Sequence, residues 1–112
     1  MRDTGGKTMF TITEGKGFHL TFSNGYTISV QWGAANYCSN RSLDGVFGIP
    51  NDLVKTGEYS CQEAEIAIWD SEKNYCIDKF PLDGLHHDGM VAGWLSVDKV
   101  GQIIGIVASH KD

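Results

Sequence analysis

The chain has 112 residues and a formal net charge of −5 at pH 7. This length is typical of one domain, so we expect residues 1–112 to form a single domain with residues 1–7 as a loose N-terminal lead-in. The acidic balance argues against DNA or RNA as a partner, because nucleic-acid binding normally needs a basic surface. No apolar run approaches the roughly 20 residues that cross a bilayer, so we expect no membrane association.

Three cysteines, Cys38, Cys61 and Cys76, stand at wide and irregular spacings. An odd number is a poor disulfide framework, and no C-x-x-C pair of the kind that binds zinc is present. We interpret the three as reduced thiols in a cytosolic protein.

Alternation of apolar and polar residues predicts strands in the first third of the chain. Phe10 and Ile12 alternate with threonines from Met9 onward, and residues 14–17 have the composition of a turn. The same period of two continues through residues 18–32, which indicates a half-buried β-hairpin.

The turn of this hairpin can be predicted because cross-strand neighbours share a face of the sheet. A two-residue Asn24-Gly25 turn would place Phe22 opposite polar Thr27. A three-residue loop, Ser23-Asn24-Gly25, keeps the apolar residues together and predicts Gly25 in the left-handed conformation. The predicted pairs are Phe22 with Tyr26, Leu20 with Ile28, and Phe18 with Val30.

Residues 33–62 break the pattern and form a polar, turn-rich segment that sequence alone does not place. Long loops of this kind are often functional. The elements expected after it are a strand at 64–69, a turn at 70–74, a return strand at 75–80, a loop at 81–89 and a short strand at 90–95.

The C-terminal segment has the features of one helix. Ser96 is a suitable N-cap, and Asp98 favours the macrodipole from the first turn. Gly101 and Gly105, four residues apart, would allow close packing on a sheet. One apolar stripe at helical spacing comprises Val97, Val100, Ile103, Ile104 and Val107. The sequence therefore predicts an α+β fold, an antiparallel β-sheet of hairpins with one C-terminal α-helix packed on it.

Two arrangements of reactive residues are weak candidates for chemistry. His86-His87-Asp88 is a dense group of metal-capable side chains, but neighbouring histidines on a loop point apart, and a solvated loop is favoured over a metal site. Cys38, His19 and Asp44 could form a nucleophilic site, yet no local motif supports that combination. We expect no enzyme activity and no cofactor.

The segment after Trp32 carries Asn36, Tyr37, Asn40 and Arg41. An aromatic ring can stack on a base, amides can bind its polar edges, and arginine can hold phosphate through two hydrogen bonds. The alternative is a structured turn in which the asparagines satisfy backbone groups, and the residue types alone favour this alternative.

Two further groups have alternative roles. The polar residues of the hairpin are expected on a face that is either hydrated or packed on a partner subunit; they are His19, Thr21, Thr27, Ser29 and Gln31. Trp69 and Trp94 are interpreted as core or interface anchors, and tryptophan at interfaces is consistent with a dimer.

The stretches 18–22, 24–25, 27–33 and 36–41, together with Gly93-Trp94-Leu95-Ser96, resemble small proteins encoded by bacteriophages and prophages. In outline the chain is similar to the Thoeris anti-defence sponge family, known for a β-sheet with a C-terminal helix and for sequestering cyclic ADP-ribose signals. The resemblance implies binding without cleavage, in a pocket between subunits of a homo-oligomer (a dimer or higher), in the bacterial host cytoplasm. The residues predicted to bind the nucleotide are Phe18, Asn36, Tyr37, Asn40 and Arg41.

Two other functions remain open. A protein-binding inhibitor of a bacterial defence complex, of the anti-CRISPR type, predicts an exposed acidic or aromatic patch and no deep pocket. An enzyme predicts a cleft with a perturbed histidine or cysteine.

Overall fold

The computed structural model describes residues 7–13, 16–41, 55–82 and 84–112. Part of the predicted turn at 14–17, and Asp44, lie outside the described residues. The elements are β1 (Met9–Ile12), β2 (Gly17–Thr21), β3 (Thr27–Gln31), β4 (Glu63–Trp69), the 3₁₀ turn η1 (Ile77–Lys79), β5 (Val91–Ser96) and α2 (Val97–Ser109). No helix among the described residues is long and apolar enough to cross a membrane.

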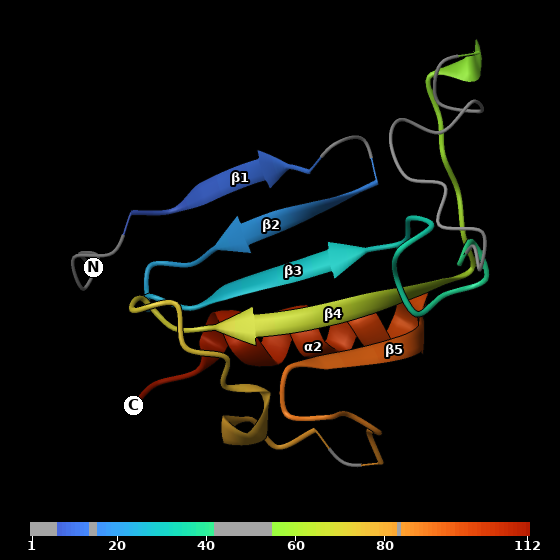
Figure 1. The fold of residues 1–112 in the computed structure, drawn as a ribbon. Coiled ribbons are helices and arrows are strands. Elements are labelled where there is room, and N and C mark those ends of the chain that lie inside the picture. The colour runs from blue at the N-terminus through green and yellow to red at the C-terminus, as the bar shows by residue number, and fades with distance from the viewer. Residues whose placement is uncertain (1–6, 14–15, 42–54, 83) are drawn as a thin grey trace.

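The strands form one antiparallel sheet in the order β1-β2-β3-β4-β5, with α2 packed on one face (Figure 1). The predicted α+β fold is therefore confirmed. The predicted hairpin register is also confirmed, because Leu20 pairs with Ile28 and Phe18 with Val30. Gly25 has φ +93°, as the three-residue loop requires.

The prediction of a return strand at residues 75–80 is wrong. Only Tyr75 forms a bridge, to Trp69, and the chain then turns through η1. Ile77 and Phe80 are both buried in the core. Residues three apart lie on one side of a helical turn but on opposite faces of a strand. Burial of both side chains in one core therefore favours the 3₁₀ turn over a strand.

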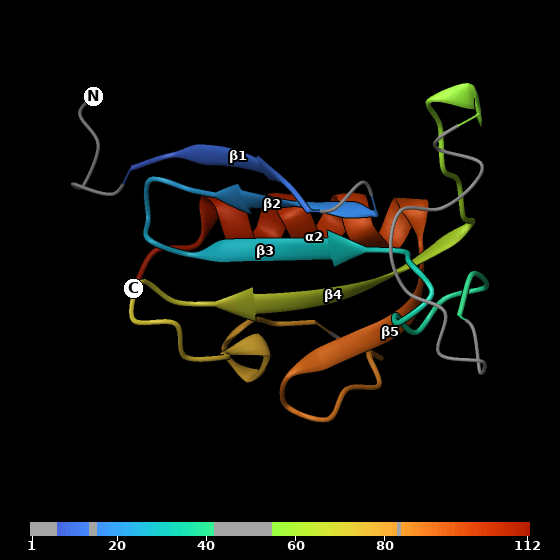
Figure 2. The same cartoon turned by 45° about the horizontal axis from the view of Figure 1, so that its top comes forward.

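Helix α2 begins as predicted, with the Ser96 hydroxyl accepting a hydrogen bond from the Lys99 N–H at 3.2 Å. Val100, Ile103 and Val107 are buried against the sheet, and Ile104 is half-buried. Val97, expected in the same stripe, is 71% exposed. The helix packs mainly on β3, β4 and β5 and lies behind these strands in both views (Figures 1 and 2).

The two helix glycines would have allowed close packing on the sheet, but the structure does not use them in this way. Gly101 and Gly105 are exposed, and a Cβ atom built on either would meet no atom within 4 Å. They lie away from the buried stripe, so their backbone freedom is not needed for packing.

The far end of α2 is fastened to the hairpin turn by Asn24. Its side-chain amide donates to the carbonyl of Val107 at 2.8 Å and to that of His110 at 3.0 Å. The last carbonyls of a helix have no partner within it, so this amide replaces the missing partner and connects residues far apart in sequence. Asn24 therefore has a second role beside its place in the turn.

The polar face of the hairpin is partly buried, and its side chains make contacts within the protein. Thr27 and Ser29 are buried, and the Thr21 and Thr27 hydroxyls lie 2.9 Å apart. The Gln31 amide donates to Thr13 at 2.6 Å, and His19 packs edge-on against Trp69. The side chains on this face therefore contact other residues on the same side of the sheet.

Glycine-to-alanine substitutions distinguish the exposed helix glycines from the turn glycine that has a left-handed backbone conformation. Gly101→Ala and Gly105→Ala should each stabilise the protein by roughly 0.5–1 kcal/mol, because alanine is the better helix former and space is available. Gly25→Ala should destabilise it by roughly 1–2 kcal/mol, because a Cβ atom is unfavourable at a left-handed φ. Chemical denaturation measures the free energy of unfolding of each variant. A loss of stability in Gly101→Ala would contradict the exposed position of that residue.

Candidate ligand-binding site

Residues 33–41 form a loop that two carboxylates of β4 hold in place. Glu65 accepts hydrogen bonds from the Asn36 amide and from the Tyr37 N–H, both at 3.0 Å. Glu63 accepts from the Ser39 N–H at 3.1 Å and from the Ser39 hydroxyl. Residues 63 and 65 point to the same side of a strand, so together they bind two successive parts of the loop.

Asn36 and Asn40 are used by the fold of this loop. Asn36 accepts from the Gly33 N–H at 2.9 Å, in addition to its bond to Glu65. Asn40 donates to the carbonyls of Trp32 and Ser60 at 2.9 and 3.1 Å. These contacts fit the structured-turn interpretation, and a ligand-binding role for the two asparagines stays a prediction.

Strand β5 contains a bulge where it passes beneath the loop. Ala64 pairs with Leu95 and Ile66 with Ala92, so β5 has one additional residue here. Trp94 has φ +58°, which is rare for a bulky residue. Its N–H donates to the Tyr37 carbonyl at 2.8 Å, so the bulge and the loop stabilise each other.

Gly93 makes this close approach possible. A Cβ atom at position 93 would lie 2.3 Å from the Cβ of Tyr37, a distance that no side chain tolerates. Only glycine lets the loop and the bulge lie in contact.

A recess of about 370 Å³ opens beside the bulge. We call it the Tyr37–Trp94 recess; its lining residues are Tyr37, His86, His87, Asp88, Val91, Gly93 and Trp94. The rings of Tyr37 and Trp94 are 42% and 55% exposed. The Arg41 guanidinium lies over the Tyr37 ring at 4.4 Å from its centroid, and it also donates to the Ala35 carbonyl at 3.3 Å. The recess thus combines two exposed aromatic rings with a neighbouring cation.

His87 and Asp88 are engaged in local structure. His87 accepts from the Gly89 N–H through Nδ1 at 3.1 Å, and its Nε2 lies 3.3 Å from Asp78. Asp88 accepts from two backbone N–H groups, which lower its pKa. No group of three or more metal-capable side chains occurs among the described residues. His86 is exposed at the rim of the recess.

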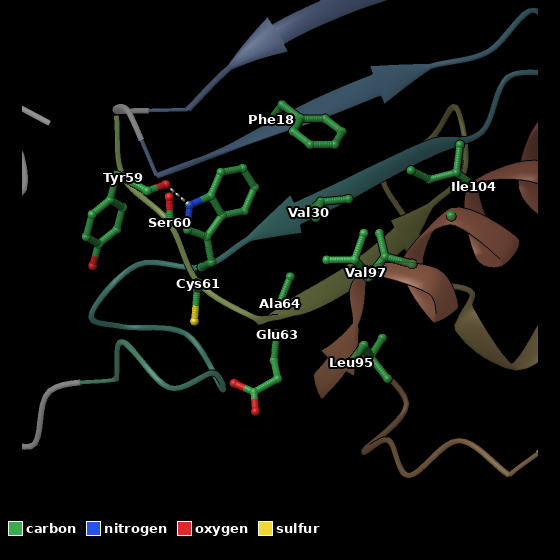
Figure 3. A pocket seen from close by; sticks show the side chains of 13 residues that line it. Phe18, Val30, Tyr59, Ser60, Cys61, Glu63, Ala64, Leu95, Val97 and Ile104 are labelled. Atoms are coloured by element: carbon green, nitrogen blue, oxygen red, sulfur yellow. Dashed lines mark hydrogen bonds between the residues drawn. The ribbon is translucent and has the colours of Figure 1, made fainter. Parts of the chain in front are cut away.

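Phe18 lies in a different hollow from Tyr37. A groove of about 470 Å³ opens between the sheet and the N-terminal half of α2 (Figure 3). Phe18, Leu95, Val97 and Ile104 form apolar walls, and Trp32 donates to the Tyr59 carbonyl at 2.8 Å. The structure therefore brings Tyr37 and Arg41 together but does not place Phe18 with them.

The three thiols have different environments. Burial raises the pKa of the Cys38 thiol to about 11. Burial also raises the pKa of Cys61, but the N–H groups of Glu63, Asn40 and Ser39 outweigh that effect and lower it overall. Cys76 has a raised pKa because of burial and the charge of Asp70. Cys38 donates to the Gly33 carbonyl at 3.6 Å, whereas His19 packs on Trp69, so these two members of the proposed nucleophilic trio have other partners.

No protein-family model matches the chain, and neither the curated proteins nor the solved structures contain a significant match. The resemblance to phage proteins therefore remains a hypothesis, and the site must be argued from its own geometry.

The sequence analysis interpreted Trp94 as a core or interface anchor and His86 as a metal-capable loop residue, and it did not connect either with Tyr37; at 55% exposure, Trp94 is not a core residue. An isolated glycine inside a strand pattern is a signal for a bulge or for a close backbone approach, and Gly93 is such a glycine. The contact with residues 33–41 carries no local sequence signal, because Tyr37 and Trp94 are far apart in the chain.

The thiol environments predict an order of alkylation by iodoacetamide. Cys61 should react first because its pKa is lowered and it is partly exposed, and Cys38 should react last because it is buried with a raised pKa. Peptide mass spectrometry over time measures this order, and Cys61→Ser should remove the fastest phase. A first modification at Cys38 would contradict the burial of that thiol.

Proposed function

We propose that this chain is a phage anti-defence protein that binds and sequesters a cyclic nucleotide immune signal, of the cyclic ADP-ribose type, without cleaving it. The observation that carries the proposal is the Tyr37–Trp94 recess, where two exposed rings flank a hollow and Arg41 lies over one of them. The site of action would be the bacterial host cytoplasm.

The chemistry of the recess suits a purine with phosphate groups. Stacking of a base on an aromatic side chain contributes about 1–3 kcal/mol, and Tyr37 and Trp94 are both exposed. Arginine binds phosphate through two parallel hydrogen bonds, and no ion pair between described residues involves Arg41. The volume of about 370 Å³ lies within the roughly 300–1,000 Å³ of small-molecule sites.

Capture is favoured over cleavage by the state of two reactive side chains, Cys38 and His87. Cleavage of a nucleotide needs a nucleophile or a general base directed at the bond. The Cys38 thiol is buried with a pKa of about 11. His87 uses both ring nitrogens in contacts with Gly89 and Asp78. Neither residue is prepared for that role.

A second candidate function is inhibition of a bacterial defence complex through protein binding. The apolar groove favours it, because none of the described residues that line the groove is a lysine, arginine or histidine. A phosphate group would have no cation there, whereas an apolar side chain of a partner protein would find Phe18, Leu95 and Ile104.

Native mass spectrometry of protein purified from bacteria with an active nucleotide-signalling defence tests the lead proposal. The wild type should carry a nucleotide-sized adduct, and Arg41→Ala should lose it. Trp94→Gly should weaken retention at least tenfold, because the stacking ring is lost while glycine suits the positive φ.

Lys111→Ala is the matched control, because it removes one positive charge near the C-terminus, at the other end of β3 from residues 33–41 (Figure 1). It should retain the adduct. A clean apo mass for the wild type under these conditions would contradict the proposal and favour a protein partner, which affinity purification from the same cells would then identify.

A further inference from the structure

The helix leaves part of its own face of the sheet uncovered. Helix α2 packs mainly on β3, β4 and β5, and β1 lies at the edge of the sheet away from it (Figure 1). Phe10 pairs with Leu20 and Ile12 with Phe18, and cross-strand neighbours share a face. We call these four residues the β1–β2 apolar face.

The outer half of this face is exposed to solvent. Phe10 and Ile12 are 89% and 82% exposed, whereas Phe18 and Leu20 are half-buried. Burial of large apolar side chains such as these is favourable, so this arrangement leaves possible burial unused. Two adjacent apolar side chains at this exposure indicate a contact surface rather than an isolated surface hydrophobe.

Strand β1 is also an edge strand with unused backbone groups. Thr13 N–H donates to the Gly17 carbonyl, and hydrogen-bonded pairs alternate along an antiparallel ladder. The backbone groups of Thr11 therefore point toward β2, and those of Phe10 and Ile12 point outward. No strand among the described residues pairs with this outer edge.

Strand β1 is short, at four residues, but it lacks three other common protections against edge pairing. Natural edge strands commonly carry a charge, a proline or a bulge. Residues Met9–Ile12 have no charge and no proline, and their pairing with β2 is regular. In a chain of net charge −5, this is a place where two copies can meet without opposing carboxylates.

We propose that a second copy of this chain pairs with β1, antiparallel and about a two-fold axis at Thr11. In this register Phe10 lies opposite the partner's Ile12, and Ile12 opposite the partner's Phe10. The outward backbone groups of residues 10 and 12 bond to each other in both copies, and the apolar side chains remain on one face. No other register centred on a single residue of β1 pairs Phe10 with Ile12, so the strand is complementary to itself.

The size of this contact determines its strength. Two paired four-residue strands bury less than the roughly 1,200 Å² of the smallest stable interfaces. We therefore expect a reversible dimer whose population rises with protein concentration. Because the contact is apolar and uncharged, added salt should not dissociate it. This proposal is independent of the ligand in the Tyr37–Trp94 recess.

Analytical ultracentrifugation of the full chain over a range of concentrations tests the proposal. The wild type should shift from monomer to dimer. Phe10→Ser should raise the dissociation constant at least tenfold by removing the ring. Phe10→Pro should do the same by removing an outward N–H, and the fold should tolerate it because proline is accepted where the N–H faces solvent.

Met9→Ser is the matched control, because Met9 is 53% exposed on the same strand but its side chain points to the opposite face. It should dimerise as the wild type does. Circular dichroism and melting temperature confirm that each variant is folded. A wild type that stays monomeric at every concentration, or a dimer that Phe10→Pro leaves unchanged, would overturn the proposal.

Discussion

The contact between Gly93 and Tyr37 is the constraint on which the candidate site depends. With no Cβ at residue 93, the loop lies directly on β5 and the Trp94 N–H reaches the Tyr37 carbonyl at 2.8 Å. That hydrogen bond accompanies a left-handed Trp94 whose ring is exposed beside Tyr37. Strained backbone of this kind persists only where its surroundings hold it, and here Glu63 and Glu65 hold the opposing loop.

The centre of the sheet forms the core, and its two edges carry the surfaces proposed for binding. The central strands and α2 form the core, with Ile28, Ile66 and Ile103 fully buried. This core fixes the end of β3, from which the loop starts, and the end of β4, to which the loop binds. The margins of the sheet carry the surfaces available for binding. The recess lies beside β5, and the uncovered apolar face lies on β1 and β2, at the opposite edge.

The predictable parts of the fold were those governed by local periodicity. Alternation from Phe18 to Trp32 determined the hairpin register, and Ser96 with the apolar stripe determined the helix. Prediction failed where a distant contact decided the conformation, as when burial of Ile77 and Phe80 produced a turn instead of a strand. Tyr37 and Arg41 were proposed from their chemistry, and their role stays a prediction; the contact of Tyr37 with Trp94 could not be predicted, because the bulge at Trp94 arises from pairing between β4 and β5.

Amide hydrogen exchange at Trp94 tests the central claim most directly. In the wild type, the hydrogen bond to Tyr37 should protect this amide although the side chain is exposed. Gly93→Ala should displace residues 33–41 and accelerate exchange at Trp94, while amides in the β2–β3 ladder keep their protection; Gly101→Ala, in open space on α2, should change neither. Equal protection of the Trp94 amide in wild type and Gly93→Ala would contradict the account, because the loop would then not depend on the glycine.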